Sequence, residues 1–468
     1  MTSFSKVSGS FRDPNGFLFF KDGILYRQIN FIYKPDYTLL MNSGLYNELT
    51  KSGWLVSHKE VEVEFFNKKI GYKIIKPLII PFISYPYEWT FSQLKDAAIL
   101  TLNIMEKALD YGMILKDASG YNVQFMGSKP IFIDTLSFAK YQEGMTWAGY
   151  RQFCQHFLAP LALMAYTDDR LNSLLRSYID GIPLDLADSL LPLKSKLKLG
   201  IMIHLSLHAK AQKMYSGKGL SKENVKRSLS LLQLKGIIKS LKKIITKLSQ
   251  SKRKTEWSNY YSGNCNYTDI SFDHKKKLVK LYLKETHPKM VWDLGANDGS
   301  FSDLASDQNI FTVAFDIDPS CVERNYLRQV ARKGAYQLPL LIDLTNPSPD
   351  LGWSCNERMS FMRRGSADLV LALALVHHLA ISNNVPLKDL ALFFSKICRY
   401  LIIEFVPKED PQVMRLLASR VDIFTEYNID SFEKVFRDFF KIRSKEKINN
   451  SLRTIYLMEK LPEDHHDK

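Results

Sequence analysis

The sequence predicts an α/β protein: the C-terminal half forms a doubly wound, mainly parallel sheet, and the N-terminal half is α+β. Three observations carry this prediction. Residues 291–300 form a short apolar run that ends in an acidic turn with two glycines. Residues 312–316 are a second apolar run ending in Asp, and residues 367–375 are continuously apolar. Such an uninterrupted run is typical of a strand buried on both faces of a parallel sheet.

The turn after the first predicted strand has the composition of a ligand-binding turn. Gly295 and Gly299 can adopt backbone angles closed to other residues, and without a Cβ they let a ligand lie against the main chain. Asp293 supplies an acceptor at the strand end, where open α/β sheets bind their ligands. Asp316, at the end of the next strand, is placed to accept both hydroxyls of a ribose. Together these residues predict a nucleoside-binding sheet.

The spacing Asp-x-Gly-x-Asn-x-Gly differs from the dinucleotide pattern, because Asp298 stands where a pyrophosphate would be repelled. A carboxylate there suits a cationic ligand. The turn resembles the first motif of class I S-adenosylmethionine-dependent methyltransferases, which have a Rossmann-like sheet and whose cofactor carries a sulfonium and an ammonium. The resemblance covers residues 255–460. The cofactor-binding residues it implies are Asp293, Gly295, Asn297, Gly299, Asp316, Ile317, Asp343 and Leu344.

Further segments follow in the order of that family. Residues 338–344 resemble the third strand, whose acid and neighbouring backbone face the adenine. Residues 376–379, Val-His-His-Leu, resemble the fourth motif. The remaining predicted elements are a helix over 393–399, a fifth strand over 400–406, and a closing antiparallel pair over 439–442 and 453–458.

The fourth motif bears on the methyl acceptor. Amide and base N-methyltransferases often carry [N/D]-P-P-[Y/F] at this place, so the His pair favours a hydroxyl acceptor and O-methylation. His377 or His378 is then a candidate general base, with Glu404 as orienting or second acid. Helix capping beside the cofactor is the alternative role for the His pair. A small hydroxylated metabolite, a sugar or glycolipid, and a protein side chain all remain open as acceptors.

The length and composition limit the class of protein that this chain can be. A chain of 468 residues predicts two or three domains. Its 46% hydrophobic and 12% aromatic content is that of a folded protein. Five cysteines without a C-x-x-C pair argue against a disulfide framework or structural zinc and favour a reducing compartment. No segment has the apolar length of a signal peptide core or a membrane span. We expect a soluble, cytoplasmic protein.

The net charge of +15 is concentrated in one segment. Residues 216–257 contain twelve Lys or Arg and two Glu, so they hold +10 of the total, and the pI does not indicate a nucleic-acid binder. Apolar residues recur at helical spacing over 225–248. This basic amphipathic helix either packs its apolar stripe on a domain or lies on an anionic membrane surface or acidic partner. The predicted division is an N-terminal domain over 1–215, a linker over 216–254 and the methyltransferase domain over 255–468.

The N-terminal half begins with a predicted hairpin over residues 17–27, because Asp-Gly between apolar runs is a hairpin signal. A helix over 37–52, a strand-rich stretch to about 84, and a helix from an N-cap at Ser92 to about Tyr111 follow. The pair His204 and His208 at i, i+4 could bind zinc, but no third ligand is evident, so no metal site is predicted.

Asp117, Asn122 and Asp134 have a spacing that resembles the catalytic loop and metal-binding Asp of protein-kinase-like and aminoglycoside-phosphotransferase-like folds. The glycine-rich phosphate loop is missing, and Arg27 stands near the usual strand Lys position. Three interpretations stay open: a kinase-like scaffold without phosphoryl transfer, an active phosphotransferase, or unrelated structure in which Asp117 and Asn122 are turn residues.

The two-part layout resembles a group of bacterial methyltransferase-like proteins of the nodulation type, on the evidence of residues 83–89, 115–119 and 374–379. This resemblance implies an S-adenosylmethionine-dependent methyltransferase in which residues 1–215 choose the acceptor. The alternative is a kinase-like or carrier-binding protein that uses the methyltransferase sheet as a cofactor-sensing or assembly module.

Overall fold

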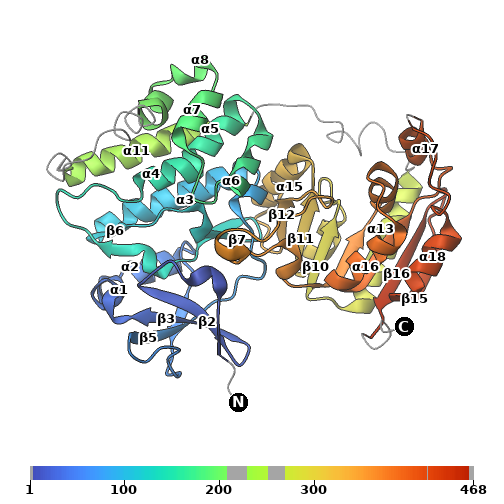
Figure 1. The fold of residues 1–468 in the computed structure, drawn as a ribbon, viewed down its shortest axis with the longest axis horizontal. Coiled ribbons are helices and arrows are strands. Elements are labelled where there is room, and N and C mark those ends of the chain that lie inside the picture. The colour runs from blue at the N-terminus through green and yellow to red at the C-terminus, as the bar shows by residue number, and fades with distance from the viewer. Residues whose placement is uncertain (1–3, 208–228, 251–268, 419, 463–468) are drawn as a thin grey trace. The chain divides into compact units, whose positions relative to one another are not determined.

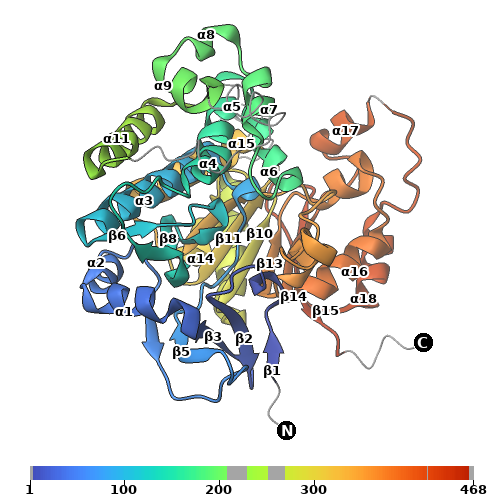
Figure 2. The ribbon, with the colours of Figure 1, turned by 60° about the vertical axis from the view of Figure 1, so that its left-hand side comes forward.

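The computed structural model describes residues 4–207, 229–250, 269–418 and 420–462 (Figures 1 and 2). The chain divides into two compact units. The first unit comprises residues 1–252 together with 350–358, and the second comprises residues 253–349 and 359–468. Across the described residues no helix is long and apolar enough to cross a membrane.

The second unit is built on a seven-stranded sheet in the order β12-β11-β10-β13-β14-β16-β15. The first five strands in this order run parallel, and β16 and β15 pair antiparallel at the end, which confirms the predicted Rossmann-like fold. The strands are β10 Met290–Leu294, β11 Phe311–Asp316, β12 Gln337–Leu341, β13 Ala367–Ala372, β14 Cys398–Phe405, β15 Phe440–Lys447 and β16 Thr454–Lys460.

Helices cover this sheet because successive side chains of a strand point to opposite faces. Val291 of β10 packs in a cluster with Val279 and Leu283 of the helix α13. Trp292, the next residue, lies against Phe315 and Phe361 instead, with ring centroids 5.8 and 5.2 Å away. The helices of this unit are α13 Asp269–Thr286, α14 Ser302–Ser306, α15 Pro319–Arg332, α16 Leu387–Ile397, α17 Pro411–Leu417 and α18 Ile429–Arg437.

The first unit opens with a five-stranded antiparallel sheet in the order β1-β2-β3-β5-β4. The predicted hairpin is confirmed: β2 and β3 are joined by Asp22 and Gly23, both at positive φ (50° and 75°). Such angles suit the tight turn of a two-residue hairpin. The five strands are β1 Phe4–Lys6, β2 Gly16–Lys21, β3 Ile24–Asn30, β4 His58–Glu60 and β5 Gly71–Pro77.

Helical segments of the first unit differ from the predicted ones in two places. The single helix predicted over 37–52 is two helices, because Gly44, at φ 89°, separates them. The predicted N-cap Ser92 is wrong. Thr90 caps the long helix, and it forms a capping box with Gln93. The helices are α1 Lys34–Asn42, α2 Leu45–Lys51, α3 Phe91–Asp110, α4 Tyr150–Phe153, α5 Ala159–Tyr166, α6 Leu174–Ser177, α7 Leu184–Leu190, α8 Leu193–Lys196, α9 Leu199–Ile201 and α11 Leu231–Lys247.

After α3 the chain forms short strands that flank the loop containing Asp117 and Asn122. β6 (Met113–Leu115) leads into the loop 116–122, and the hairpin of β7 (Val123–Met126) and β8 (Lys129–Phe132) leads into Asp134. β9 (Phe138–Lys140) then returns to pair with β6. The hairpin, helices, strands, long helix and loop follow one another in the order predicted from the sequence.

The basic helix predicted over 225–248 is α11, but it begins later than predicted, at Leu231 after the N-cap Ser230. Val225 lies outside the described residues. Its apolar stripe is packed: Leu234, Ile238, Leu241 and Ile245 are all fully buried. Two of its lysines pair with α3: Lys235 contacts Asp110 at 2.8 Å, and Lys242 pairs with Glu106. This helix therefore belongs to the core of the first unit.

A network of four buried charges ties together separate parts of the second unit. Lys275 of α13 pairs with Glu404 of β14 (Nζ–Oε2 2.5 Å), and Arg453 contacts the other Glu404 oxygen at 3.5 Å. Arg453 also holds Asp410, the N-cap of α17, with Nε–Oδ2 at 2.7 Å. None of the four residues is more than 4% exposed. Removing one member therefore leaves an uncompensated buried charge.

We predict that Arg453→Ala lowers the free energy of unfolding of the second unit by about 3–5 kcal/mol, because it removes the cation that pairs with buried Asp410 and with one oxygen of buried Glu404. Equilibrium urea unfolding of the full chain measures this loss. The matched control is Lys408→Ala, which breaks a partly exposed pair with Asp422 and is expected to cost less than about 1 kcal/mol. Equal losses in both variants contradict the assignment.

Candidate functional site

The turn after β10 is fastened to the end of the neighbouring strand β11. Gly295 and Ala296 both donate their amides to the Phe315 carbonyl at 2.9 Å. The Asn297 amide then donates to the Asp316 carboxylate at 2.7 Å. The chain makes this turn with positive φ at Gly295 (75°) and Asn297 (51°). Three predicted site residues, Gly295, Asn297 and Asp316, thus meet at one edge of the sheet.

The two glycines of the turn have different structural roles. Gly295 is exposed, and a Cβ built there approaches only the side chain of Leu375, at 3.3 Å. Its backbone is therefore open to a ligand. A Cβ at Gly299 is placed 2.3 Å from the Asn325 amide and 2.6 Å from the Gln337 amide. Gly299 is needed for the close packing of the turn on α15 and β12.

The end of β11 presents one carboxylate and one apolar side chain. Asp316 accepts the amides of Asn297 and, at 2.9 Å, of Asp318. Burial raises the pKa of Asp316 to about 6. Ile317, the next residue, is 59% exposed although it is apolar. An acceptor beside an exposed apolar surface suits a ligand with hydroxyls next to a flat ring.

Asp293, Asp343 and Leu344 complete the predicted set. Asp293 is 2% exposed, accepts a hydrogen bond from Ser302 Oγ at 2.6 Å, and has its pKa raised to about 7 by burial. It thereby holds the start of α14 against the strand end. Asp343 accepts from the amide and hydroxyl of Thr345 at 2.8 and 2.6 Å in the loop after β12, where Leu344 is half-buried.

The predicted catalytic residues follow β13 and β14. His377 is fully buried, and neither ring nitrogen has a hydrogen-bond partner among the residues that the structure describes. His378 lies beside it, with ring centroids 4.1 Å apart, and is only partly buried. Burial lowers the pKa of His377 well below its usual value and that of His378 to about 4, so both are neutral at pH 7. Glu404 is fully buried in its pairs with Lys275 and Arg453.

Some residues of this site were missed by the sequence reasoning. Ser302 holds Asp293, and Arg328 donates to the Asp298 carbonyl at 2.6 Å. Ala374, at φ 51°, turns the chain between β13 and the His pair, and Leu375 lies over Gly295. Alanine carries no signal for a left-handed conformation, so only the structure reveals this turn. Ser302 and Arg328 act through contacts that no local pattern indicates.

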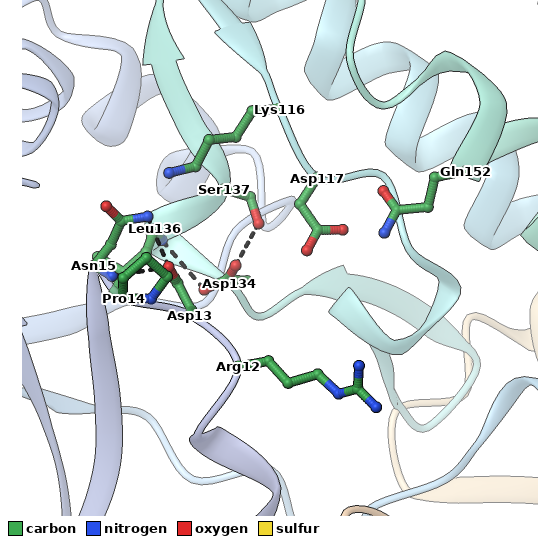
Figure 3. A pocket seen from close by; sticks show the side chains of 10 residues that line it. All are labelled: Arg12, Asp13, Pro14, Asn15, Lys116, Asp117, Asp134, Leu136, Ser137 and Gln152. Carbon is green, nitrogen blue, oxygen red and sulfur yellow. Dashed lines mark hydrogen bonds between the residues drawn. The ribbon is translucent and has the colours of Figure 1, made fainter. Parts of the chain in front are cut away.

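A second site lies within the first unit, where Asp117 and Asp134 line a cavity of about 380 Å³ (Figure 3). Arg27 pairs with Asp134 at 2.6 Å, and Ser137 donates to the same carboxylate. Asn122 reaches Ser137 at 3.3 Å, so the three predicted residues do cluster. The full lining is Arg12, Asp13, Pro14, Asn15, Lys116, Asp117, Asp134, Leu136, Ser137 and Gln152.

The charges of this cavity depart from those of a phosphoryl-transfer site. Asp134, the position expected to hold magnesium, is already occupied by Arg27 and Ser137. Burial raises the pKa of Asp117, and the nearby Asp134 raises it further. The Ser119 amide donates to Asp117 at 3.0 Å, as in an ordinary Asx turn.

His204, one member of the predicted His pair, forms two polar contacts within the first unit. Its Nδ1 lies 2.7 Å from the Tyr150 hydroxyl and its Nε2 lies 3.0 Å from Ser240 Oγ. His208 lies outside the described residues. Among the residues that are described, no group of His, Cys, Asp and Glu could hold a metal ion.

A known protein is similar to this chain over nearly its full length. Nodulation protein NoeA of Rhizobium meliloti (strain 1021) is 36% identical over 469 residues, which cover 97% of this chain and 96% of the relative. Magnesium protoporphyrin IX methyltransferase (ChlM) from Synechocystis PCC 6803, solved with bound SAH, is similar over 42% of this chain and 90% of its own (TM-score 0.31, 17% identity).

WbdD, solved with the kinase inhibitor LY294002, is similar over 44% of this chain and 43% of its own, with a TM-score of 0.29 and 17% identity. No protein-family model matches the chain. Identity of 36% along nearly the full length of both proteins shows common descent. The chain belongs to the family of nodulation protein NoeA.

Proposed function

We propose that this protein is an S-adenosylmethionine-dependent methyltransferase that binds its cofactor at the carboxyl ends of β10 and β11. The observation that carries the proposal is the turn in which Asn297 is bonded to Asp316 beside the open backbone of Gly295. In this proposal Asp316 accepts the ribose hydroxyls and the adenine lies on Ile317, whose exposed apolar side chain supports the assignment. Buried carboxylates around the turn favour a cationic ligand over a pyrophosphate.

The residues present fit this cofactor. The turn offers the open backbone of Gly295 beside the Asp316 carboxylate, which is an acceptor. Asp293 keeps its carboxylate behind the strand end by accepting a hydrogen bond from Ser302. When bound, the cofactor supplies an electrophilic methyl group for in-line displacement. The protein's contribution is to hold the acceptor atom in line with that methyl group, and such positioning supplies much of the rate.

We further propose a hydroxyl acceptor, with His378 as the group that takes its proton. His378 is neutral at pH 7 and partly exposed, so it can accept a proton at physiological pH. His377 lies beside it, and neither of its ring nitrogens has a hydrogen-bond partner within the described ranges, which supports a role in orienting His378 or the acceptor. Val-His-His-Leu at residues 376–379, in place of [N/D]-P-P-[Y/F], supports a hydroxyl over an amide nitrogen as the acceptor.

Phosphoryl transfer by the first unit is not favoured. In enzymes of that class the second Asp holds magnesium and the phosphates are gripped by glycine-rich backbone. Here the Asp134 carboxylate already pairs with Arg27 and accepts a hydrogen bond from Ser137. We assign the first unit to acceptor selection, with the cavity around Asp117 as the candidate pocket.

Ile317→Ala is expected to weaken S-adenosylmethionine binding five- to thirtyfold, or ~1–2 kcal/mol, because it removes apolar surface that the adenine covers. Isothermal titration calorimetry on the full chain measures the affinity. Ile270→Ala is the matched control, since Ile270 is an equally exposed isoleucine (60%) on α13 of the same unit. If both variants bind as well as the wild type, the adenine does not lie on Ile317.

Cofactor affinity should also fall in acid. Asp316 must be ionised to accept ribose hydroxyls, and its pKa is raised to about 6, so protonation competes with binding as the pH falls below that value. We expect affinity about tenfold weaker at pH 5 than at pH 7.5. In Asp316→Asn the affinity should be low and lose this dependence. A dependence that persists in the variant assigns the titration to Asp293 and contradicts the role of Asp316.

A further inference from the structure

The connection between β12 and β13 lacks the crossover helix that parallel strands usually have. Residues 342–366, all described by the structure, contain two short 3-10 turns (Trp353–Cys355 and Phe361–Arg363) and no α-helix. A parallel sheet normally uses a helix for such a crossover. Loops of this length without regular structure are uncommon in compact domains and are mostly functional. Something other than a packed helix must hold this connection.

The middle of the connection, residues 350–358, belongs to the first unit. Arg12 grips Glu357 with two parallel bonds, Nε–Oε2 at 2.9 Å and Nη2–Oε1 at 2.7 Å. The Glu357 side chain is only 2% exposed, whereas that of Arg12 is 55% exposed. Bidentate pairs of this kind are among the stronger and more directional polar contacts in proteins.

Three further contacts fit the same segment to the first unit. Ser8 Oγ donates to the Asn356 carbonyl at 2.7 Å. Gly9 is required beside it, because a Cβ there is placed 2.5 Å from the Glu357 carbonyl oxygen. The Arg358 guanidinium lies over the Tyr121 ring, 4.0 Å from its centroid.

The segment is also folded on itself, as a docked element would be. Leu351 and Arg358 exchange backbone hydrogen bonds at 3.0 and 3.1 Å, and the Trp353 amide donates to the Glu357 carboxylate at 2.8 Å. Gly352 takes φ 82°, and a Cβ there is placed within 2.7 Å of the Glu357 side chain. The Glu357 carboxylate therefore bonds both to Trp353 within the segment and to Arg12 outside it.

We propose that residues 350–358 form a strap that docks on a surface of the first unit made by Ser8, Gly9, Arg12 and Tyr121. Docking of the strap replaces the crossover helix and orders the connection from Asp343 onward. That connection begins at Asp343 and Leu344 of the proposed cofactor edge, so the first unit supports cofactor binding through the strap. This last link rests on the proposed function.

The test uses the full chain with Arg12→Ala and hydrogen–deuterium exchange of peptides covering residues 343–364. We expect exchange there to rise about tenfold or more, because the buried Glu357 carboxylate loses its bidentate Arg12 partner and keeps only the Trp353 amide. Arg170→Ala is the matched control: Arg170 makes the same two-bond contact with Asp168 and is 66% exposed, and it does not touch the strap. The conservative change Arg12→Lys keeps the positive charge and should retain part of the protection that Arg12→Ala loses.

Cofactor affinity provides the second readout. Arg12→Ala should weaken S-adenosylmethionine binding about three- to tenfold, a loss of the size expected for disordering a supporting loop. Unchanged exchange in both Arg12→Ala and Glu357→Gln overturns the strap, and raised exchange with unchanged affinity overturns its link to the cofactor edge. If the wild type binds no cofactor while exchange still rises, the proposed function fails and the docking stands.

Discussion

The hydrogen bond from the Asn297 amide to the Asp316 carboxylate is the contact on which the edge of the second unit depends. It exists because β10 and β11 run parallel in a register that sets Leu294 beside Phe315. With two amides already on the Phe315 carbonyl, the chain reaches Asp316 through left-handed conformations at Gly295 and Asn297. The same bond holds the carboxylate at the strand end and leaves Ile317 facing outward.

In the second unit, four buried charged residues form one network of ion pairs. Lys275, Glu404, Arg453 and Asp410 satisfy one another, while the two histidines are kept neutral by burial and by those cations. A neutral, partly exposed imidazole next to a fixed ion network suits proton transfer from an acceptor hydroxyl. In the first unit, by contrast, Arg27 neutralises Asp134, so its cavity keeps a polar lining without the free second acid of a magnesium site.

Much of the fold could be predicted because continuous apolar runs ending in Asp mark buried parallel strands, and the sheet order confirms them. The turn at 295–299 was predictable from its glycines. The ends of the elements were harder to predict. Thr90 and Ser92 are both good N-cap residues, and Gln93, three residues after Thr90, favours Thr90 because it completes a capping box. The placement of Glu404 could not be predicted, since its partner Lys275 is 129 residues away. The Arg12–Glu357 pair spans 345 residues, and no local pattern indicates it.

The most direct test of this account is a crystal structure of the full chain with S-adenosylhomocysteine. The account predicts the nucleoside at the carboxyl ends of β10 and β11, with both ribose hydroxyls on Asp316, the adenine against Ile317, and the amino-acid part along the backbone of Gly295. A nucleoside bound elsewhere, or one at this edge whose ribose does not meet Asp316, would contradict it.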